Sequence, residues 1–412
     1  MSTTKYHLEE VTTRSQERRW IDFPKQGLYN EYPNWVCPLD TDVEAVFDPK
    51  RNELFADGEA IRWVACTADG SIVGRIAAFY NREKAAIEEQ PTGGCGFFES
   101  IDDQEVANLL FDAAREWLQS KGMEAMDGPI NFGQRSDWWG LLIEGYDHEP
   151  LYKNPYQPPY YKALFENYGF QNYFNQHSYN WNIGTSEASD RLKTRSERLY
   201  AMDSGYQIKP IEMKRLPEMA EALRQIYNLG WAHFMGVKPL EKEDAQHLVK
   251  VMRPIIDPDI ILFAYHNDKP IGFFISLPDL NCIIGRFQGK FGLWQKLRLM
   301  WELKVRRSAK RIFGMIFGIT PEYQGKGVES AIMYKYLQYV ESDRCPYKDV
   351  EMAWIGDFNP VMNRMLTSYA GASPFKKHTT YRYLFDREKE FKRCPRLGLK
   401  RDPKPAAAEG DK

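Results

Sequence analysis

The sequence predicts a mixed α/β protein in which two similar halves follow one another along the chain. The chain has 412 residues, more than a single hydrophobic core usually organises, so two domains are expected. A β-hairpin pattern followed by further strands and helices occurs once in each half. The last helix of each half also ends in a similar phrase, over residues 161–170 and 362–371. This repetition indicates an internal duplication.

The N-terminal half begins its sheet with a hairpin. Two apolar strands with a turn at Asp69 and Gly70 fill the stretch from Ile61 to Tyr80. A helix follows from about Asp103 to Ser120, because apolar residues recur on one face and Gly122 stands just beyond its end. We expect this helix to pack on the sheet.

The C-terminal half repeats this order of events. A strand from Ile260 to Tyr265, a turn at Asn267 and Asp268, and a return strand from Pro270 to Ser276 form its hairpin. Strands and helices then alternate around a glycine-containing loop. The predicted elements are a strand at Arg311 to Ile319, a helix from about Lys326 to Glu341, a strand at Val350 to Ile355, a short helix from Pro360 and a last strand around Tyr381 to Phe385.

Polar segments set the predicted boundaries. The stretch between the halves is charged and largely without apolar periodicity, with room for a short helix at Asp190 to Tyr200. The C-terminal stretch is rich in Pro and Lys, which is typical of disorder. The predicted parts are an N-terminal domain at 1–185, a linker at 186–205, a C-terminal domain at 206–388 and a disordered tail at 389–412.

Composition excludes several classes of function. With 55 basic and 57 acidic residues the net charge is -2, which gives no overall attraction for nucleic acid. Six cysteines form no C-x-x-C pair and show no metal-ligand spacing with the seven histidines, so we expect reduced thiols and no metal. Neither a signal peptide nor a run of roughly 18 apolar residues is found. We therefore expect a cytoplasmic protein.

The clearest chemical signal is a loop from Ile319 to Glu329, between a predicted strand and a predicted helix. Its glycines allow a tight turn that brings amide groups toward an anion. The positive end of the helix dipole and Lys326 favour a pyrophosphate, such as that of coenzyme A. The alternative is that Gly325 and Gly327 only form a tight turn.

The segment Pro321–Gly327 resembles the acyl-CoA loop of GNAT acyltransferases, and residues 354–359, Met362 and Gly371 resemble that family's next strand and helix. The similarity covers residues 206–388. It implies two tandem GNAT-like domains, each with a mixed, mostly antiparallel central sheet flanked by helices. It also implies a slot for the co-substrate acyl-CoA between two diverging strands. The residues expected to bind acyl-CoA are Gly318, Ile319, Thr320, Gln324, Gly325, Lys326, Gly327, Val328, Glu329, Asn359 and Met362.

Two positions depart from the GNAT pattern. Glu329 stands where Gly or Ala is frequent, so its carboxylate is compatible with a phosphate only if it points into solvent. Leu366 stands where the family usually has a tyrosine that can protonate the departing thiolate.

Over most of its length, the chain resembles a group of bacterial tandem-GNAT proteins that is similar to bacterial ceramide synthases. The segments that carry this resemblance are 35–39, 96–99, 128–131, 140–145 and 277–281. It implies N-acylation of a primary amine, with a long-chain, sphingoid-like amine as acceptor. Two alternatives stay open: a GNAT acetyltransferase acting on a small polar amine, and a non-catalytic acyl-CoA-binding or membrane-adaptor protein.

The N-terminal half is predicted to bind no acyl-CoA. In place of the glycine loop it has residues 99–105, whose carboxylates would repel a pyrophosphate but suit a helix cap. Aromatic residues at 136–139 and 154–161 either line the acceptor cleft or pack between the domains.

An amine must lose a proton as it attacks a thioester, so the site needs a base. Glu351 and Asp357 are candidates because they lie on the strand that borders the slot, although such carboxylates are more often solvated or capping residues. Tyr323 is the candidate proton donor to the leaving sulfur, with a packed loop aromatic as the alternative. The residues expected at the acceptor are Trp231, His233 and Trp354.

A basic insertion at 285–311 holds nine Lys and Arg residues against the single acid Glu302. Apolar residues between them repeat with helical spacing. Such a helix suits either peripheral contact with the anionic inner face of a membrane or packing on the N-terminal domain. RNA is less favoured, because no recognisable nucleic-acid module is present.

Overall fold

The computed structural model describes residues 5–182, 186–231, 239–369 and 371–396. The hairpin and the long helix predicted for the N-terminal half are confirmed as β2–β3 and α4. The elements of this half are β1 (Tyr6–Glu10), α1 (Arg14–Asp22), α2 (Asp40–Val46), β2 (Gly58–Thr67), β3 (Ile72–Asn81), α3 (Arg82–Ala86), β4 (Thr92–Ser100), α4 (Gln104–Ser120), β5 (Ala125–Gly128), β6 (Leu141–Glu144), α5 (Tyr161–Tyr168) and β7 (Gln171–Asn182).

The C-terminal half follows the predicted order of strands and helices. Its elements are α6 (Ser186–Met202), β8 (Tyr206–Pro210), α7 (Leu216–Trp231), α8 (Lys242–Met252), β9 (Ile261–His266), β10 (Lys269–Pro278), α9 (Asn281–Ile284), α10 (Leu293–Lys304), β11 (Arg311–Ile319), the 3-10 turn η5 (Pro321–Tyr323), α11 (Val328–Val340), β12 (Asp349–Gly356), α12 (Pro360–Arg364), the π-helical turn η6 (Met365–Tyr369) and β13 (Ser373–Leu384).

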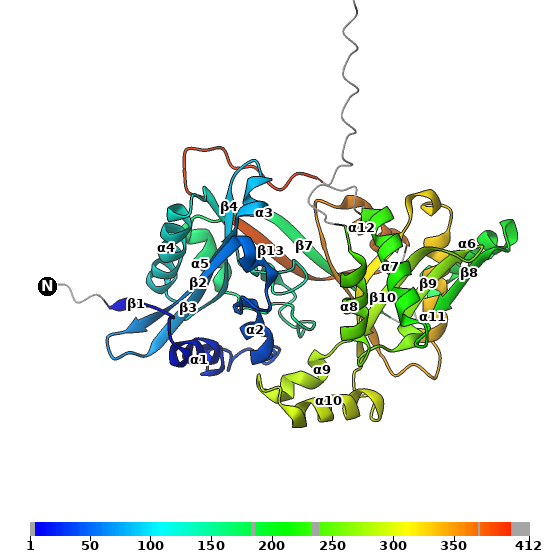
Figure 1. The fold of residues 1–412 in the computed structure, drawn as a ribbon, viewed down its shortest axis with the longest axis horizontal. Coiled ribbons are helices and arrows are strands. Elements are labelled where there is room, and N and C mark those ends of the chain that lie inside the picture. The colour runs from blue at the N-terminus through cyan, green and yellow to red at the C-terminus, as the bar shows by residue number, and fades with distance from the viewer. Residues whose placement is uncertain (1–4, 183–185, 232–238, 370, 397–412) are drawn as a thin grey trace, which may run out of the picture.

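Within the described residues, one sheet of 13 strands runs through both halves (Figure 1). Its order is β1-β2-β3-β4-β5-β13-β7-β12-β11-β10-β9-β8, and β6 pairs with β13. Most neighbours are antiparallel, while β4–β5 and β11–β12 are parallel. The fold is thus the predicted mixed α/β class, with a mostly antiparallel sheet flanked by helices.

The two halves exchange strands at the centre of this sheet. β7, from the N-terminal half, pairs with β12, and β13, at the end of the chain, pairs with β5, β6 and β7. Each half therefore completes the backbone hydrogen bonds of the other. The domain ranges 1–185 and 206–388 stay a prediction, but each contains a strand whose partners lie in the other range.

The segment predicted as a linker, 186–205, is largely helical. α6 is longer than the short helix expected there, and it packs along α11. Of the tail predicted at 389–412, residues 397–412 lie outside the described residues.

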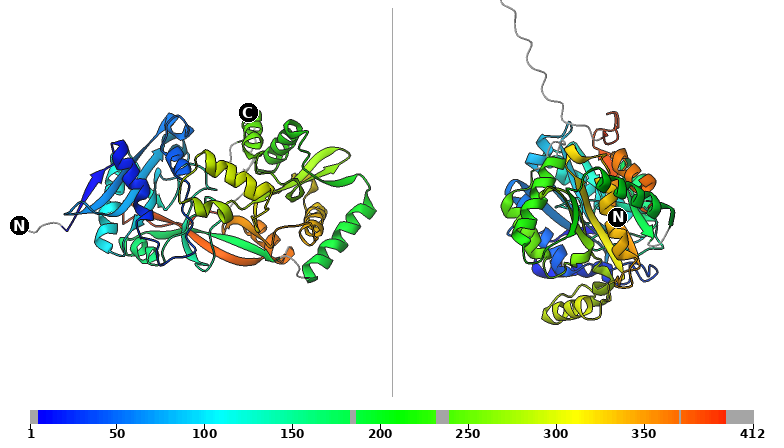
Figure 2. Two further views of the ribbon diagram at one scale, coloured as in Figure 1. Left: turned by 90° about the horizontal axis from the view of Figure 1, so that it is seen from below. Right: turned by 90° about the vertical axis from the view of Figure 1, so that its right-hand side faces the viewer.

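Each half has its own hydrophobic core between the sheet and its long helix, and Figure 2 shows the two halves from two further directions. Under α4, Leu110 and Ala114 are fully buried. Under α11, Ile332 and Tyr336 are fully buried. Their spacing of one helical turn explains why each helix lies flat on its part of the sheet.

Candidate functional site

The predicted slot lies between β11 and β12. These parallel strands pair only as far as Gly314 and Met352. On the other edge of β11, the pairing with β10 skips Met315. Such a bulge bends a strand, so β11 turns away from β12 at this point and leaves the edge up to Ile319 open.

The backbone groups along that open edge correct part of the prediction. The N–H of Thr320 donates to a carbonyl of β10 at 2.9 Å. Because neighbouring residues of a strand direct their backbone groups to opposite edges, Gly318 also faces β10, whereas Ile319 and Phe317 face the slot. The carbonyl of Ile319 already accepts from Nε2 of Gln324 at 2.9 Å. The groups left for a ligand are the N–H of Ile319, which was predicted to bind acyl-CoA, and the N–H and carbonyl of Phe317, which was not predicted.

The loop after β11 directs several amide groups to one place. Gly325 and Gly327 have φ of 71° and 99°, which glycine adopts without strain. Gly327 is the N-cap of α11, whose first internal hydrogen bond runs from the N–H of Ala331 to the carbonyl of Gly327. In the described chain, the N–H groups of residues 325–330 donate to no protein acceptor. With the exposed Lys326 beside it, this helix start is suited to an anion.

Side chains at the start of α11 differ from expectation. The N–H of Gln324 is already taken by the carbonyl of Pro321 at 3.3 Å. Val328 is buried in the core and offers only its backbone. Oε2 of Glu329 is shielded from solvent and has no partner among the described residues, so this oxygen does not meet the condition under which the carboxylate was judged compatible with a phosphate. Oγ of Ser330 is also buried and unpaired there, so a ligand oxygen could accept its proton.

Tyr323 is held in place by a chain of hydrogen bonds through His266 to Asp203, which could not be predicted from the sequence. Its hydroxyl lies 3.0 Å from Nδ1 of His266, and Nε2 of His266 lies 2.8 Å from Oδ2 of Asp203. His266 ends β9, which runs parallel to β11, so both strand ends reach the same edge of the sheet. The chain braces the base of the loop, and the role of Tyr323 as proton donor to sulfur stays a prediction.

Glu351 lies in a buried ion network. It is 1% exposed, and its carboxylate lies 2.8 Å from Nζ of Lys376 and 3.5 Å from Nη1 of Arg311. Burial raises the pKa of Glu351, and the two cations oppose that shift. Arg311 also pairs with Asp279 at 2.6 Å, and both cations donate to backbone carbonyls at 149–150. These contacts join the two halves and favour a structural role for Glu351.

The side chains of Asp357 and Asn359 also form hydrogen bonds within the protein. Oδ2 of Asp357 accepts from Arg393 at 2.6 Å and from Asn175 at 3.1 Å. Oδ1 of Asn359 accepts the N–H of Met362 at 3.2 Å, so Asn359 caps α12, a role the sequence analysis had considered for Asp357. The contacts of Asp357 favour structural anchoring, and cofactor binding by Asn359 and Met362 stays a prediction.

The residues predicted for the acceptor are only partly visible. The side chain of Trp231 and the whole of His233 lie outside the described residues. Trp354 lies where the halves meet, because its Nε1 donates to the carbonyl of Arg135 at 3.2 Å. The aromatic segment 136–139 begins at the residue after Arg135, which contacts β12, one of the two strands that border the slot.

One histidine at this junction had no signal in the sequence. His177 of β7 pairs with Ile355, beyond the point where β11 and β12 part. Its side chain is half-buried, and burial lowers its pKa, so the imidazole is neutral at neutral pH. Only the strand exchange brings this residue of the N-terminal half beside β12, on the edge of β12 that faces away from β11.

The N-terminal half has the same divergence of strands but fills it. β4 and β5 pair only as far as Gly94 and Asp127. Beyond that point the N–H of Ile130 donates to the carbonyl of Cys95 at 2.9 Å. A Cβ on Gly96 would lie 1.8 Å from the carbonyl oxygen of Ile130. The chain itself thus occupies the place that a pantetheine arm would need.

The acidic side chains of the loop that follows β4 are engaged within the N-terminal half, and its inability to bind an anion stays a prediction. Oδ1 of Asp103 accepts the N–H of Glu105 at 2.9 Å and caps α4. The side chain of Glu99 is only 12% exposed and accepts hydrogen bonds from the hydroxyls of Tyr29 and Tyr161 at 2.6 and 2.9 Å.

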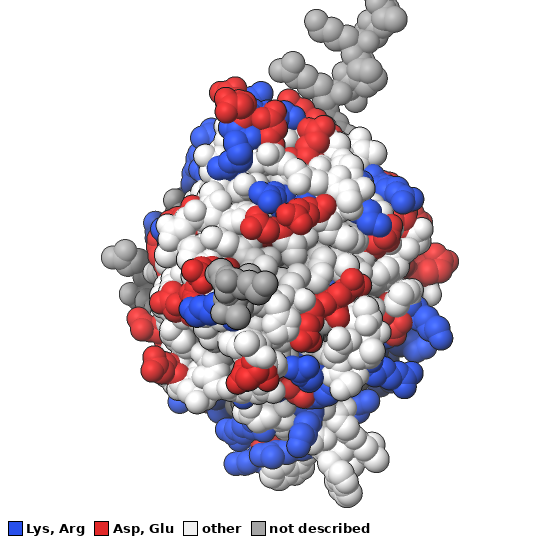
Figure 3. All heavy atoms as spheres, turned by 90° about the vertical axis from the view of Figure 1, so that its left-hand side faces the viewer, with Lys and Arg blue, Asp and Glu red and all other residues white. Residues whose placement is uncertain are grey.

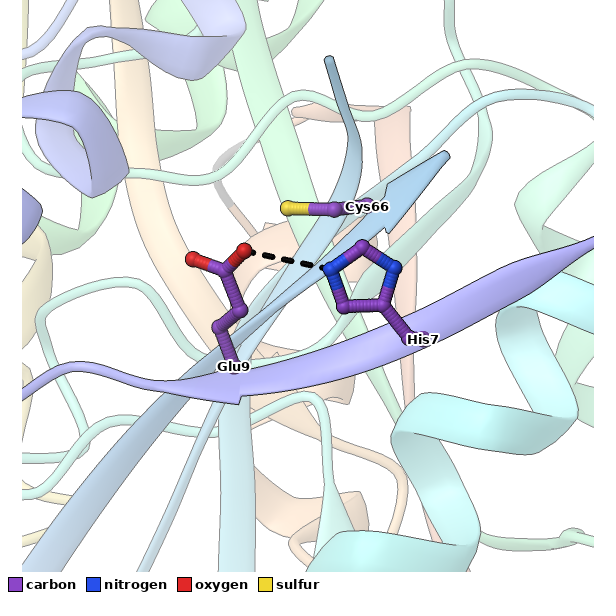
Figure 4. Close-up of side chains that lie close together, drawn as sticks. All are labelled: His7, Glu9 and Cys66. Carbon is purple, nitrogen blue, oxygen red and sulfur yellow. Dashed lines mark hydrogen bonds and ion pairs between the residues drawn. The ribbon is translucent and has the colours of Figure 1, made fainter. Parts of the chain in front are cut away.

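A cluster of possible metal ligands lies at the far edge of the sheet. Figure 4 shows His7 and Glu9 on β1 beside Cys66 on β2, and the ligand atoms of all three lie within 4.8 Å of one another. Spacing along the sequence could not reveal it, because the pairing of β1 with β2 brings His7 opposite Cys66. Nε2 of His7 lies 3.2 Å from Oε1 of Glu9, and Arg19 lies 4.0 Å from the same carboxylate. The guanidinium of Arg19 already neutralises the carboxylate of Glu9, which favours a structural role for this cluster over metal binding.

No family model matches the sequence. By structure, the chain is similar to a tandem GNAT protein from the clavulanic acid biosynthesis pathway, with a TM-score of 0.51 and 12% identity, covering 92% of this chain and 98% of that one. It is also similar to a GCN5-related glucosamine N-acetyltransferase region of a fungal multi-domain GH3 beta-N-acetylglucosaminidase, with a TM-score of 0.55 and 13% identity. That match covers 93% of this chain but only 38% of the fungal chain. These likenesses show the tandem GNAT fold.

By sequence, the chain is 25% identical over 379 residues to "Bacterial ceramide synthase" of Caulobacter vibrioides (strain NA1000 / CB15N), covering 90% of this chain and 95% of that protein. It is 30% identical over 378 residues to "Protein YghO" of Escherichia coli (strain K12), covering 88% of this chain and 92% of YghO. The chain therefore belongs to the same family as YghO, and it has the tandem GNAT fold.

Proposed function

We propose that the protein transfers the acyl group of an acyl-CoA thioester to a primary amine in the C-terminal slot. The observation that carries the proposal is the contrast between the halves. The opening between β11 and β12 is followed by unpaired amides at a helix start, whereas the opening between β4 and β5 is filled by Ile130. We infer that pantetheine lies along Phe317 and Ile319, and that the pyrophosphate meets the amides of 325–330.

The acceptor in this proposal is a long-chain, sphingoid-like amine, which the relative named as a ceramide synthase supports. The amine nitrogen attacks the thioester carbonyl, an amide bond forms, and the carbon–sulfur bond breaks to release CoA as the thiol. The amine must give up one proton in this step, and the sulfur must gain one.

His177 is our candidate for the base. A neutral imidazole can accept the proton, and burial lowers the pKa of His177, which favours the neutral form. His177→Gln should lower kcat by about 100-fold, the usual size of general-base catalysis, with little change in KM. The matched control is His148→Gln, because His148 is also partly buried, has a lowered pKa and lies against Phe375. Equal kcat in the two variants would remove His177 from the mechanism.

Two measurements test the proposal as a whole. Calorimetry should show CoA binding to the full chain, and palmitoyl-CoA with sphinganine should yield an N-acyl product seen by mass spectrometry. Transfer only from acetyl-CoA to small polar amines would replace the long-chain acceptor. Binding of CoA without turnover across an amine panel would favour a sensor, and no CoA binding would refute the proposal.

A further inference from the structure

The outer face of α10 exposes large apolar side chains to solvent. α10 projects from the body of the molecule at its lower side in Figure 1 and again in the right-hand view of Figure 2. The exposed apolar residues on and just after it are Leu293, Trp294, Leu297, Trp301 and Val305, each between 49% and 79% exposed. Steps of three and four residues place them on one side of the helix. The opposite side is buried at Leu299 and Glu302.

The body of the protein does not cover this face. The insertion does contact the N-terminal half, but through its first residues. The N–H of Asp40 donates to the carbonyl of Gly289 at 2.8 Å, and Gly285 lies against Val36. Packing on the N-terminal half, one of the two sequence-based interpretations, therefore holds for residues 285–289 and not for the apolar face of α10.

Cations surround the exposed face. The exposed Lys and Arg residues of the insertion are Arg286, Lys290, Lys296, Arg298, Lys304, Arg306, Arg307 and Lys310. Arg311, which the sequence analysis counted with them, is instead buried against Asp279 and Glu351. The single acid, Glu302, is buried beneath the helix and is paired with Arg306 at 3.3 Å. Figure 3 shows Lys and Arg side chains gathered beside uncharged atoms at the lower end of the molecule.

We propose that the outer face of α10 docks on the surface of an anionic lipid bilayer. Trp, Leu and Val can enter the boundary between headgroups and acyl chains, while Lys and Arg keep their charges among the anionic headgroups. A second copy of the chain would bring like charges together, and a nucleic acid would leave Leu and Val in water. None of the described helices is long and apolar enough to cross a membrane, so this contact is peripheral.

Vesicle sedimentation of the full chain tests whether the Lys and Arg residues around α10 contribute to binding of anionic lipid. The protein should bind vesicles of phosphatidylcholine with 30% phosphatidylglycerol and should not bind phosphatidylcholine alone. Lys290→Gln with Lys296→Gln should lower the partition coefficient about 30-fold, since each cation near such a surface is worth about 1 kcal/mol. Lys214→Gln with Lys250→Gln, two exposed lysines on other elements, should leave it unchanged. Equal binding to both vesicles, or an equal loss in both variants, would overturn the proposal.

The apolar part is tested in the same way. Trp294→Ser with Trp301→Ser should abolish vesicle binding, whereas Ile87→Ser with Val251→Ser, which remove other exposed apolar side chains, should retain it. If the tryptophan variant instead loses a concentration-dependent dimer, the face belongs to a second copy and the docking proposal fails. Acyl transfer by the same variants is measured with the substrates in detergent micelles, where no bilayer has to be bound. Loss of vesicle binding can then be distinguished from loss of acyl transfer, so each proposal can fail without the other.

Discussion

Neighbouring lysines on β13 show how differently single charged residues are used. Lys376 is buried and bridges Glu351 and the carbonyl of Glu149, whereas Lys377 reaches the solvent-exposed Glu144 at 3.0 Å. The strand directs them to opposite faces of the sheet. Lysine therefore forms a buried ion pair at position 376 and a surface ion pair at position 377.

Removing these two charges should have very different effects on stability. Lys376→Met leaves the buried Glu351 without its nearest cation, which should lower the free energy of unfolding by about 3–5 kcal/mol. Lys377→Met removes a surface pair and should cost less than about 1 kcal/mol. Urea denaturation of both variants measures the difference. Similar values would mean that Glu351 is not held as an ion in the folded protein.

His378 gives a pH dependence of stability. Burial lowers its pKa to about 4. Between the ordinary pKa of 6.5 and about 4, the unfolded chain binds a proton that the folded protein does not, so stability falls as the pH falls. This group should cost about 2 kcal/mol between pH 7 and pH 5. In His378→Gln that part of the slope should vanish, whatever the variant's stability at pH 7. An unchanged slope would show that His378 takes up its proton in the folded state.

Elements with local patterns were predictable, and elements made by distant pairing were not. The β2–β3 hairpin and α4 follow from apolar periodicity, turn residues and a capping carboxylate, all within a few residues of one another. The loop after β11 was found because glycines at fixed spacing stood between a strand and a helix. The hydrogen bonds of Tyr323 with His266 and of His266 with Asp203, and the pairing of His177 with β12, depend on which strands become neighbours. No local pattern records that choice.

The glycine loop can be tested against a matched turn. Gly325 and Gly70 both have positive φ and both have free space where a side chain would be placed. Valine at either position should cost roughly the same backbone strain, on the order of 1–2 kcal/mol. Only Gly325→Val should also weaken CoA binding, by at least about tenfold, because its side chain enters the anion site. Calorimetry with CoA and thermal unfolding measure both effects, and equal CoA affinity in the two variants would place the pyrophosphate elsewhere.

At the scale of the whole molecule, the strand exchange makes one folding unit of two duplicated halves. β13 pairs with β5 and β6, β7 pairs with β12, and the network around Arg311 and Lys376 joins both sides. Neither half keeps a complete sheet without the other. The N-terminal half thus contributes β7, the strand that carries His177, to the side of β12.

The strand exchange predicts that a destabilising substitution in the hydrophobic core of one half also lowers the stability of the other half. Leu110→Ala in α4 should cost about 2–5 kcal/mol, because it empties a fully buried site in the N-terminal core. If the halves unfold together, amide hydrogen exchange in α11 should show the same loss of protection as α4. The reciprocal variant, Leu337→Ala in α11, should lower protection in α4 in the same way. Loss confined to the mutated half in both variants would mean that the halves open independently and that the shared strands do not couple them.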